Sequence, residues 1–266
     1  MARNWLGLEG RVVIVTGGAS GIAKHVVTTL QGADAVPVIA DVAVETGQEI
    51  DGAYCIKCDV TSAESVQAMA DAVVTKYGKI DALVNVAGIN LPRLLVDVKG
   101  EHPEYELNDD SYNKMFDINV RGMVYCAQAC VRQMLKQGGG VIVGMSSESG
   151  KEGSQGQSAY SATNGARDSL IRSWAKELGP YNIRVVGVAP GIMEPTGLRS
   201  PAYNAALAYT RGVRVEDLST DYRKVIPLGR EGKLDEVGNL VAFLVSDRAS
   251  YISGTTVNIS GGKSRG

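Results

Sequence analysis

The sequence has little of what would indicate a membrane, metal-binding or nucleic-acid-binding protein. No apolar run approaches the ~18 residues that a membrane span needs, and the apolar stretch near the N-terminus is typical of a first strand, not of a signal peptide. Only two histidines occur in 266 residues, which argues against a metal site. The net charge of −2 provides no basic surface for nucleic acid. We therefore expect a cytoplasmic protein that binds neither metal nor nucleic acid nor membrane.

Cysteine is also scarce, with four in the chain. Cys55 and Cys58 have the C-x-x-C spacing of redox and zinc sites. However, "YCIKCDV" reads as a strand, and residues three apart on a strand point to opposite faces. Cys126 and Cys130 are spaced for one helix face, where they would be small buried apolar groups. A reduced, cytosolic setting is the expectation for all four.

What the sequence does contain is a regular alternation of short β-branched runs and helical segments. Strands are predicted at 11–16, 37–41, 54–60, 82–88, 140–147, 184–191 and 255–262. Helices are predicted between them, at 62–77, 111–137, 158–178 and 234–246. Such alternation predicts an α/β fold: one doubly wound Rossmann-type domain over residues 1–266, with a seven-stranded, mostly parallel sheet and helices on both faces. Segments at about 90–110 and 192–227 interrupt the pattern, and we expect them to form the substrate side.

The first strand, the turn after it and the helix that follows predict a dinucleotide site. In "VVIVTGGASGIAKHVVTTL", Gly17 permits a sharp turn and Gly21 lets the backbone approach a pyrophosphate at the helix N-terminus. Asp41 ends the second strand 20 positions after Gly21. An acid there binds ribose hydroxyls and repels a 2′-phosphate, so NAD is predicted rather than NADP. Ala23 stands where the usual motif has a third glycine.

Several motifs spread along the chain together resemble the short-chain dehydrogenase/reductase family over nearly its whole length. They are Thr16–Ala23, Asp59-Val60, Asn85-Val86-Ala87-Gly88, Asn119, Ser147, Tyr160 and Pro190-Gly191. Within that family, stretches such as "SSESGKEGSQGQSAY" and "VVGVAPGIMEPTGLR" are similar to the bacterial sorbitol-6-phosphate 2-dehydrogenases. The resemblance implies an NAD-dependent oxidoreductase that interconverts D-glucitol 6-phosphate and D-fructose 6-phosphate. It also implies a homotetramer, with interfaces at helices 111–137 and 158–178 and at the C-terminal segment.

The resemblance also assigns roles to individual residues. Tyr160 would be the general base, Ser147 would hydrogen-bond the substrate oxygen, and Asn119 would hold a water in a proton relay. The implied cofactor contacts are Gly17, Ser20, Gly21, Ile22, Asp41, Asp59, Val60, Asn85, Ala87, Gly88, Asn164, Pro190, Gly191 and Ile192. Predicted substrate contacts are Arg93, Glu148, Lys151 and Gln157, with Arg93 ranked first for a phosphate and Arg199 on another wall of the cleft.

The sequence departs from the family pattern one helical turn after Tyr160, where a catalytic lysine is replaced by Asn164. A free tyrosine has a pKa near 10 and is a poor base at neutral pH without a nearby cation. Asn164 carries no charge, although it would retain a contact with the nicotinamide ribose. Arg167 lies on the same helical face and would supply the cation if it reached back, but a solvated or subunit-interface position is the simpler expectation. Two hypotheses follow: an enzyme with weakened or re-optimised catalysis, or a non-catalytic dinucleotide-binding homologue.

Overall fold

The computed structural model describes residues 5–197, 199–218 and 222–264. Its centre is a sheet of eight strands in the order β3-β4-β2-β1-β5-β6-β7-β8. Every neighbouring pair is parallel except β3 with β4. The strands are β1 (Val12–Thr16), β2 (Val36–Asp41), β3 (Glu49–Ile50), β4 (Ala53–Lys57), β5 (Ala82–Asn85), β6 (Gly140–Met145), β7 (Ile183–Pro190) and β8 (Thr256–Ile259).

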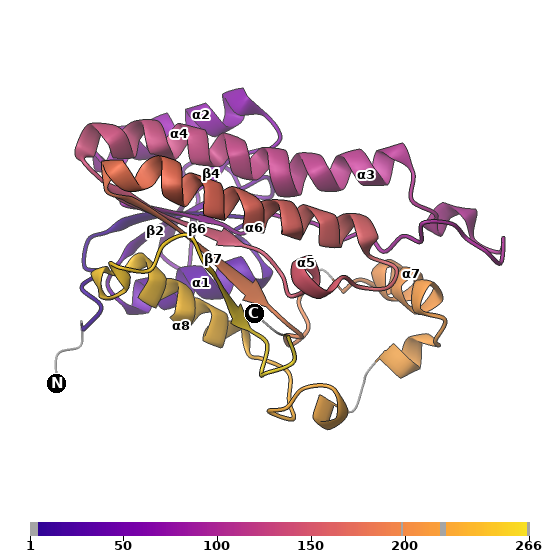
Figure 1. Ribbon diagram of the computed structural model, residues 1–266. Helices are drawn as coiled ribbons and strands as arrows, with labels where there is room; N and C mark the ends of the chain where they lie inside the picture. Colours follow the sequence, from indigo (N-terminus) through magenta and orange to yellow (C-terminus); the bar gives the residue numbers. More distant parts are fainter. Residues whose placement is uncertain (1–4, 198, 219–221, 265–266) are drawn as a thin grey trace.

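Helices cover both faces of this sheet, which confirms the predicted Rossmann-type α/β fold (Figure 1). One face carries α1 (Gly21–Gly32) and α8 (Leu234–Val245), which pack against each other. The other carries α2 (Ala63–Tyr77), α4 (Gly122–Gln137) and α6 (Ser158–Leu178). The shorter helices are α3 (Asp109–Phe116), α5 (Ser149–Glu152) and α7 (Pro201–Arg211). Two buried clusters of mainly aliphatic side chains, one on each face, form the core.

The sheet has one strand more than the seven that the sequence predicts. The additional strand, β3, forms a short antiparallel hairpin with β4. Asp51 and Gly52 connect the two strands with φ values of 49° and 80°. An Asp-Gly pair with positive φ is the preferred two-residue hairpin turn, because its twist matches that of the strands. Only two residues of β3 pair with β4, too few for a detectable alternation of polar and apolar residues.

The helix expected over 111–137 is present but contains a π turn. It runs as α3, a π segment at Asp117–Arg121, and α4. Asn119 lies at the centre of the π segment and is completely buried. Such single-turn bulges occur often at functional sites because they redirect a side chain.

The prediction that Cys55 and Cys58 face opposite sides of the sheet is confirmed. Cys55 belongs to the core cluster that packs on α1 and α8, and Cys58 belongs to the cluster on the other face. All four cysteines are free and buried. Within the described part of the chain, no group of three or more His, Cys, Asp or Glu side chains is placed to hold a metal ion. None of the described helices has the length and apolar character to cross a membrane.

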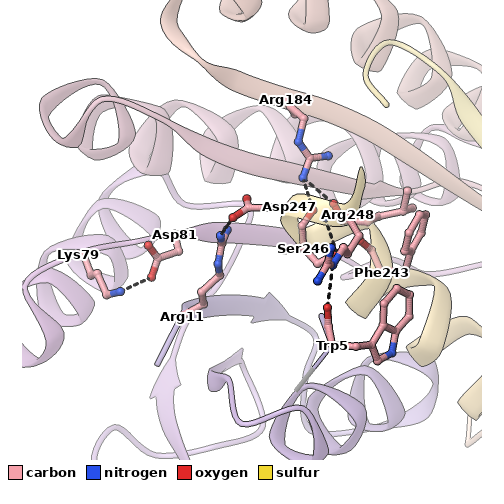
Figure 2. A network of polar contacts seen from close by, with 10 residues as sticks. Trp5, Arg11, Lys79, Asp81, Arg184, Phe243, Ser246, Asp247 and Arg248 are labelled. Carbon is pink, nitrogen blue, oxygen red and sulfur yellow. Dashed lines mark hydrogen bonds and ion pairs between the residues drawn. The ribbon is translucent and has the colours of Figure 1, made fainter. Parts of the chain in front are cut away.

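At the amino ends of the central strands, a polar network ties the N-terminal segment to the end of α8 (Figure 2). Arg11, which precedes β1, pairs with Asp247 just after α8. Arg184 at the start of β7 donates to the carbonyl oxygens of Leu244 and Ser246 at 2.8 and 3.0 Å. Arg248 donates to the carbonyl of Trp5 at 2.8 Å. This end of the sheet is thus fixed by polar contacts and lies opposite the candidate site.

Candidate active site

A cavity of about 940 Å³ lies along the carboxyl ends of the strands. In open α/β sheets this is the edge at which ligands bind. Its walls come from the turn after β1, the ends of β2 and β4, the loops after β5, β6 and β7, and α7. Those segments are far apart in the sequence, and the parallel sheet brings them to a single edge. The size of the cavity falls within the usual range for small-molecule and cofactor sites.

The turn between β1 and α1 has the geometry of a phosphate cradle. Gly17 has φ +71°, and a Cβ at that position would lie 3.1 Å from the Cα of Ala87. Glycine is needed here because the left-handed backbone and the close approach of the β5 loop leave no room for a side chain. Thr16, which is completely buried, accepts hydrogen bonds from the backbone N–H groups of Val86 and Ala87, both at 3.1 Å. The turn and the β5 loop are therefore held as one unit.

Two acidic residues stand at the other end of the cavity. The half-buried Asp41 carboxylate accepts from the backbone N–H groups of Ala19 at 3.1 Å and Ala43 at 3.0 Å, so it is fixed against the glycine-rich turn. Asp59 is exposed and accepts from the N–H and hydroxyl groups of Thr61 at 2.9 and 2.7 Å. Each carboxylate thus presents negative charge and acceptor capacity to a ligand at this end.

The structure brings most of the predicted cofactor residues to this cavity. Those in its walls are Gly17, Ser20, Gly21, Ile22, Asp41, Asp59, Val60, Ala87, Gly88, Pro190 and Gly191. Asn85, Asn164 and Ile192 lie outside the walls. Asn85 is buried at the end of β5, where its side chain donates to the carbonyl of Met123 at 3.5 Å. The carbonyl of Ile192 accepts from the N–H of Gly232 at 3.0 Å.

Ser147 and Tyr160 both line the same cavity. Ser147 follows β6, and its hydroxyl oxygen is 3.1 Å from the hydroxyl of Ser149, which donates to it. Tyr160 lies in the first turn of α6 and is half-buried. A serine hydroxyl and a phenol that face one cavity can together hydrogen-bond the oxygen of an alcohol or ketone.

Asn119 is used inside the protein and does not point freely into the cavity. Its side-chain oxygen accepts from the N–H of Ile89 at 2.8 Å, and its amide nitrogen donates to the carbonyl of Ile89 at 2.9 Å and to Thr163 at 3.1 Å. Its backbone carbonyl accepts from Arg167 Nε at 2.6 Å. Asn119 therefore joins the π segment, the β5 loop and α6, and the predicted water relay remains a prediction.

Asn164, at the position of the family lysine, is completely buried and does not line the cavity. Its amide nitrogen donates back to the carbonyl of Tyr160 at 3.0 Å, and its Oδ1 has no hydrogen-bond partner among the described residues. A Cβ on Gly150 would lie 2.8 Å from the Asn164 carbonyl carbon, so α5 packs directly on this part of α6. Asn164 thus caps its own helix turn under α5 and presents no charge to the site.

The expectation that Arg167 is solvated or lies at a subunit interface is wrong. Its side chain is 4% exposed and forms part of the cavity wall. The guanidinium donates from Nε to the carbonyl of Asn119, from Nη1 to that of Met145 at 2.8 Å, and from Nη2 to that of Ala87 at 2.7 Å. Burial lowers the pKa of Arg167 to about 10, against an opposing contribution from Tyr160. Arg167 reaches inward because three loops offer it carbonyl oxygens, an arrangement that helical spacing alone does not reveal.

The predicted substrate residues lie behind the cavity wall rather than in it. Arg93 donates to the carbonyl of Pro92 at 2.7 Å, and its guanidinium carbon is 6.0 Å from the centre of the Tyr105 ring. Glu148 pairs with Lys263 at 2.7 Å, and Lys151 is exposed on α5. Burial disfavours the charge of Lys263, but the hydrogen bond from Glu148 raises its pKa overall. Of the basic side chains that the sequence suggests for a phosphate, Arg199 is the one in the cavity wall.

The sequence gave no indication of a polar cluster on the substrate side, formed around Tyr203 of α7. The Tyr203 hydroxyl lies in the cavity wall and accepts from Gln157 at 3.0 Å and Asn90 at 3.2 Å. Because both lone pairs are occupied, its own proton is free to donate to a ligand oxygen. Burial, followed by the nearby Tyr160, raises the pKa of Tyr203 and keeps it a donor. The only sequence signal was that α7 falls within the interrupting segment 192–227.

Comparison with known proteins now identifies the family. The family model described as enoyl-(acyl carrier protein) reductase matches residues 17–264. Sorbitol-6-phosphate 2-dehydrogenase of Klebsiella pneumoniae is 52% identical over 98% of this chain and 99% of its own length. The chain belongs to the short-chain dehydrogenase/reductase family. A 3-oxoacyl-[acyl-carrier-protein] reductase of Thermotoga maritima is 35% identical over 96% of this chain and 98% of its own.

Solved structures of the family have the same fold. The ligand-free aldohexose dehydrogenase of Thermoplasma acidophilum superposes with a TM-score of 0.81 at 27% identity, covering 96% of this chain and 94% of its own. The 3-ketoacyl-(acyl-carrier-protein) reductase of Brucella melitensis, solved with NADH, superposes with a TM-score of 0.80 at 26% identity, covering 97% and 100%. Short-chain dehydrogenase/reductases use nicotinamide cofactors.

The described residues fit such a cofactor. The cradle at Gly17 leaves space where a side chain would clash, and α1 directs unpaired N–H groups of its first turn at the same place. An acid at the end of β2 faces the position of an adenosine ribose. The departure from the family is confined to the catalytic helix, where an uncharged Asn164 is buried and a buried Arg167 lies in the cavity wall instead.

Proposed function

We propose that this protein is an NAD-dependent oxidoreductase that interconverts D-glucitol 6-phosphate and D-fructose 6-phosphate. The observation that carries the proposal is the convergence of Ser147, Tyr160 and a dinucleotide cradle on one cavity. The choice of substrate is supported by 52% identity, over almost the full length of both chains, to a sorbitol-6-phosphate 2-dehydrogenase. By resemblance to the family we further propose a homotetramer.

In this proposal the protein moves a proton while the cofactor takes the hydride. A bound nicotinamide ring accepts the hydride that leaves the alcohol carbon. Tyr160, as phenolate, removes the hydroxyl proton of the same alcohol, and the C–O bond becomes the carbonyl of the ketose. Ser147 donates a hydrogen bond to that oxygen and fixes its position. In the reverse direction Tyr160, as phenol, returns the proton.

The substrate side offers partners for both parts of a sugar phosphate. Tyr203, oriented by Gln157 and Asn90, would donate to a hydroxyl of the polyol chain. Arg199, in the cavity wall, would bind the phosphate; it takes the first rank that the sequence gave to Arg93. Negative charge at Asp41 favours NAD over NADP because it repels a 2′-phosphate.

The direct test is NADH formation from D-glucitol 6-phosphate across a range of pH, together with a titration of NADH binding. Turnover that requires the phosphate supports the proposal. NADH binding without turnover of any polyol phosphate at any pH would contradict it and favour the alternative of a non-catalytic dinucleotide-binding protein.

A pair of arginine variants tests the assignment of the phosphate. Arg199→Ala should raise KM for D-glucitol 6-phosphate by roughly 10- to 100-fold, the range for loss of a charged hydrogen bond. Arg93→Ala is the matched control, because Arg93 lies near the cavity but outside its walls. Both variants should leave KM for unphosphorylated glucitol unchanged. If Arg93→Ala has the larger effect, the phosphate lies at the other end of the cleft.

A further inference from the structure

The position of positive charge in this site raises a question that the family pattern does not answer. A phenol with an ordinary pKa near 10 is mostly protonated at neutral pH and cannot accept a proton. A cation within about 4–6 Å favours the phenolate form. Asn164, one turn after Tyr160, is uncharged and buried outside the cavity walls. If Tyr160 is the base, the positive charge must come from elsewhere in the site.

Arg167 is the buried cation in the cavity wall. It is 4% exposed, and its three carbonyl acceptors belong to three separate segments: the π turn, the end of β6 and the β5 loop. A guanidinium has five N–H groups. These three hydrogen bonds leave one N–H on each terminal nitrogen without a partner among the described residues. The side chain is therefore rigidly held, yet it retains donors and full charge at the cavity.

The positive charge of Arg167 is not neutralised within the protein. No carboxylate of the described residues lies within 4.0 Å of its guanidinium. Burial of an unpaired charge is strongly unfavourable, and carbonyl dipoles compensate for it only in part. An anion that forms in the same cavity is stabilised by this charge, and the interaction is little screened because water is excluded on the protein side. The electrostatic contribution of Tyr160 to Arg167 indicates that the two groups interact.

The glycine at the end of the β5 loop makes room for this arrangement. A Cβ on Gly88 would lie 3.2 Å from Arg167 Nη2 and 3.2 Å from the side-chain oxygen of Asn119. Those distances are tighter than ordinary van der Waals contact, so alanine at this position would push the guanidinium away. Gly88 thus offers a way to displace the charge without removing it.

We propose that Arg167 stabilises the phenolate of Tyr160 and thereby takes over the electrostatic role of the lysine that Asn164 replaces. The inference rests on the proposed function, in which Tyr160 is the general base. Arg167 keeps its own protons throughout, so the proton of the alcohol goes to the Tyr160 oxygen alone. Arg167 is thus a positioning residue that acts through Tyr160.

Other titratable groups around Tyr160 have to be considered in a test that varies pH. Tyr203 on α7 interacts electrostatically with Tyr160 and stays protonated over the range of interest. Charged groups on other walls of the cavity are Glu194 and Arg199 after β7, and Lys114 and Asp117 on the helix after the β5 loop. A change confined to Arg167 leaves all of these in place.

The first measurement needs no turnover. The near-ultraviolet absorbance of phenolate is titrated in the full-length protein and in Tyr160→Phe, and the difference isolates the ionisation of Tyr160. In Arg167→Met this step should move to higher pH by about one to three units. Arg167→Lys should keep it near its original position. Arg167→Met combined with Asn164→Lys should restore it, because the charge returns to the same helix face.

The restoration distinguishes an electrostatic role from a structural one. A lysine at position 164 cannot replace the three carbonyl contacts of Arg167, so a purely structural role would not be rescued. Circular dichroism and NADH binding establish that each variant is folded. If Arg167→Met does not fold, Gly88→Ala provides the second variant and should move the step in the same direction. An unchanged step in a folded Arg167→Met or Gly88→Ala protein overturns the proposal.

The second measurement is the pH profile of kcat/KM for alcohol oxidation. In Arg167→Met the acid limb should move upward, with a loss at neutral pH of roughly 10- to 1000-fold that shrinks at alkaline pH. A loss of equal size at every pH overturns the proposal. If the unmodified protein oxidises no polyol phosphate, the proposed function fails, while the phenolate titration still decides the role of Arg167.

Discussion

The cofactor preference can be tested at a single carboxylate. Asp41→Asn removes the charge but keeps the size of the side chain and an oxygen that can accept from Ala19, whose N–H lies 3.1 Å from the carboxylate. The glycine-rich turn should therefore keep its conformation. Any change in cofactor affinity then reports the charge itself rather than a collapse of the cradle.

The magnitude follows from the position of the carboxylate. A 2′-phosphate carries about −1.5 to −2 charges. Two unit charges ~4 Å apart repel by about 1 kcal/mol in water and about 4 kcal/mol at an effective dielectric constant near 20. Asp41 is half-buried, so solvent screens it and the lower part of this range applies. We expect NADH to bind more tightly than NADPH by about 1–3 kcal/mol, which is roughly 5- to 150-fold in Kd.

Calorimetric titration with NADH and NADPH, at low and high salt, measures this preference. In Asp41→Asn the preference should fall below about threefold, mainly through tighter NADPH binding, and it should lose its dependence on salt. Asp59→Asn is the matched control, since Asp59 lines the same cavity on another strand end. It should change the two affinities equally. Equal affinities in the unmodified protein, or an unchanged preference in Asp41→Asn, would refute this reasoning.

Three further predictions concern catalysis and stability. Asn164→Lys alone should change kcat/KM at neutral pH less than about threefold, because Arg167 already provides the cation, and should lower Tm because two like charges would share a buried helix face; a gain of 100-fold or more would show that the base was unassisted. Thr16→Val should lower the free energy of unfolding by about 2–4 kcal/mol in urea denaturation, since two buried N–H groups lose their acceptor. The hydrogen bond from Arg230 lowers the pKa of Glu236 to about 2. Glu236→Gln should therefore reduce stability by about 0.5–1 kcal/mol above pH ~4.5, and the difference from the unmodified protein should vanish as the pH falls toward ~2.

The parts of the fold that sequence analysis predicted well are those set by local pattern. Seven of the strands appear close to the predicted positions, and α6 has the predicted bounds, 158–178. Buried parallel strands must be apolar on both faces and helices must be amphipathic, so their order along the chain already implies a doubly wound sheet. The strand β3 and the π turn at Asp117–Arg121 were missed. One is too short to show a period, and the other depends on contacts with distant loops.

The same division applies to the site. The glycine-rich turn, Asp41, Ser147 and Tyr160 could be found in the sequence because short motifs at strand ends define them, and each lies in the cavity wall. Arg93 and Lys151 were chosen for their charge and their place after a strand, and both lie outside that wall. Tyr203 was not recognised, because its hydrogen bonds come from residues 46 and 113 positions away.

The sequence by itself determined that this chain forms a dinucleotide-binding α/β fold of the short-chain dehydrogenase/reductase family and that its catalytic helix lacks the lysine. It did so because strand period, glycine turns and motif spacing are local properties of the chain. Only the tertiary structure decided where the nearest positive charge lies. A surface position and a buried position for Arg167 are equally compatible with helical spacing. The choice between them was made by carbonyl oxygens of Ala87, Asn119 and Met145, which lie 80, 48 and 22 residues away and meet at the guanidinium only when the sheet is assembled.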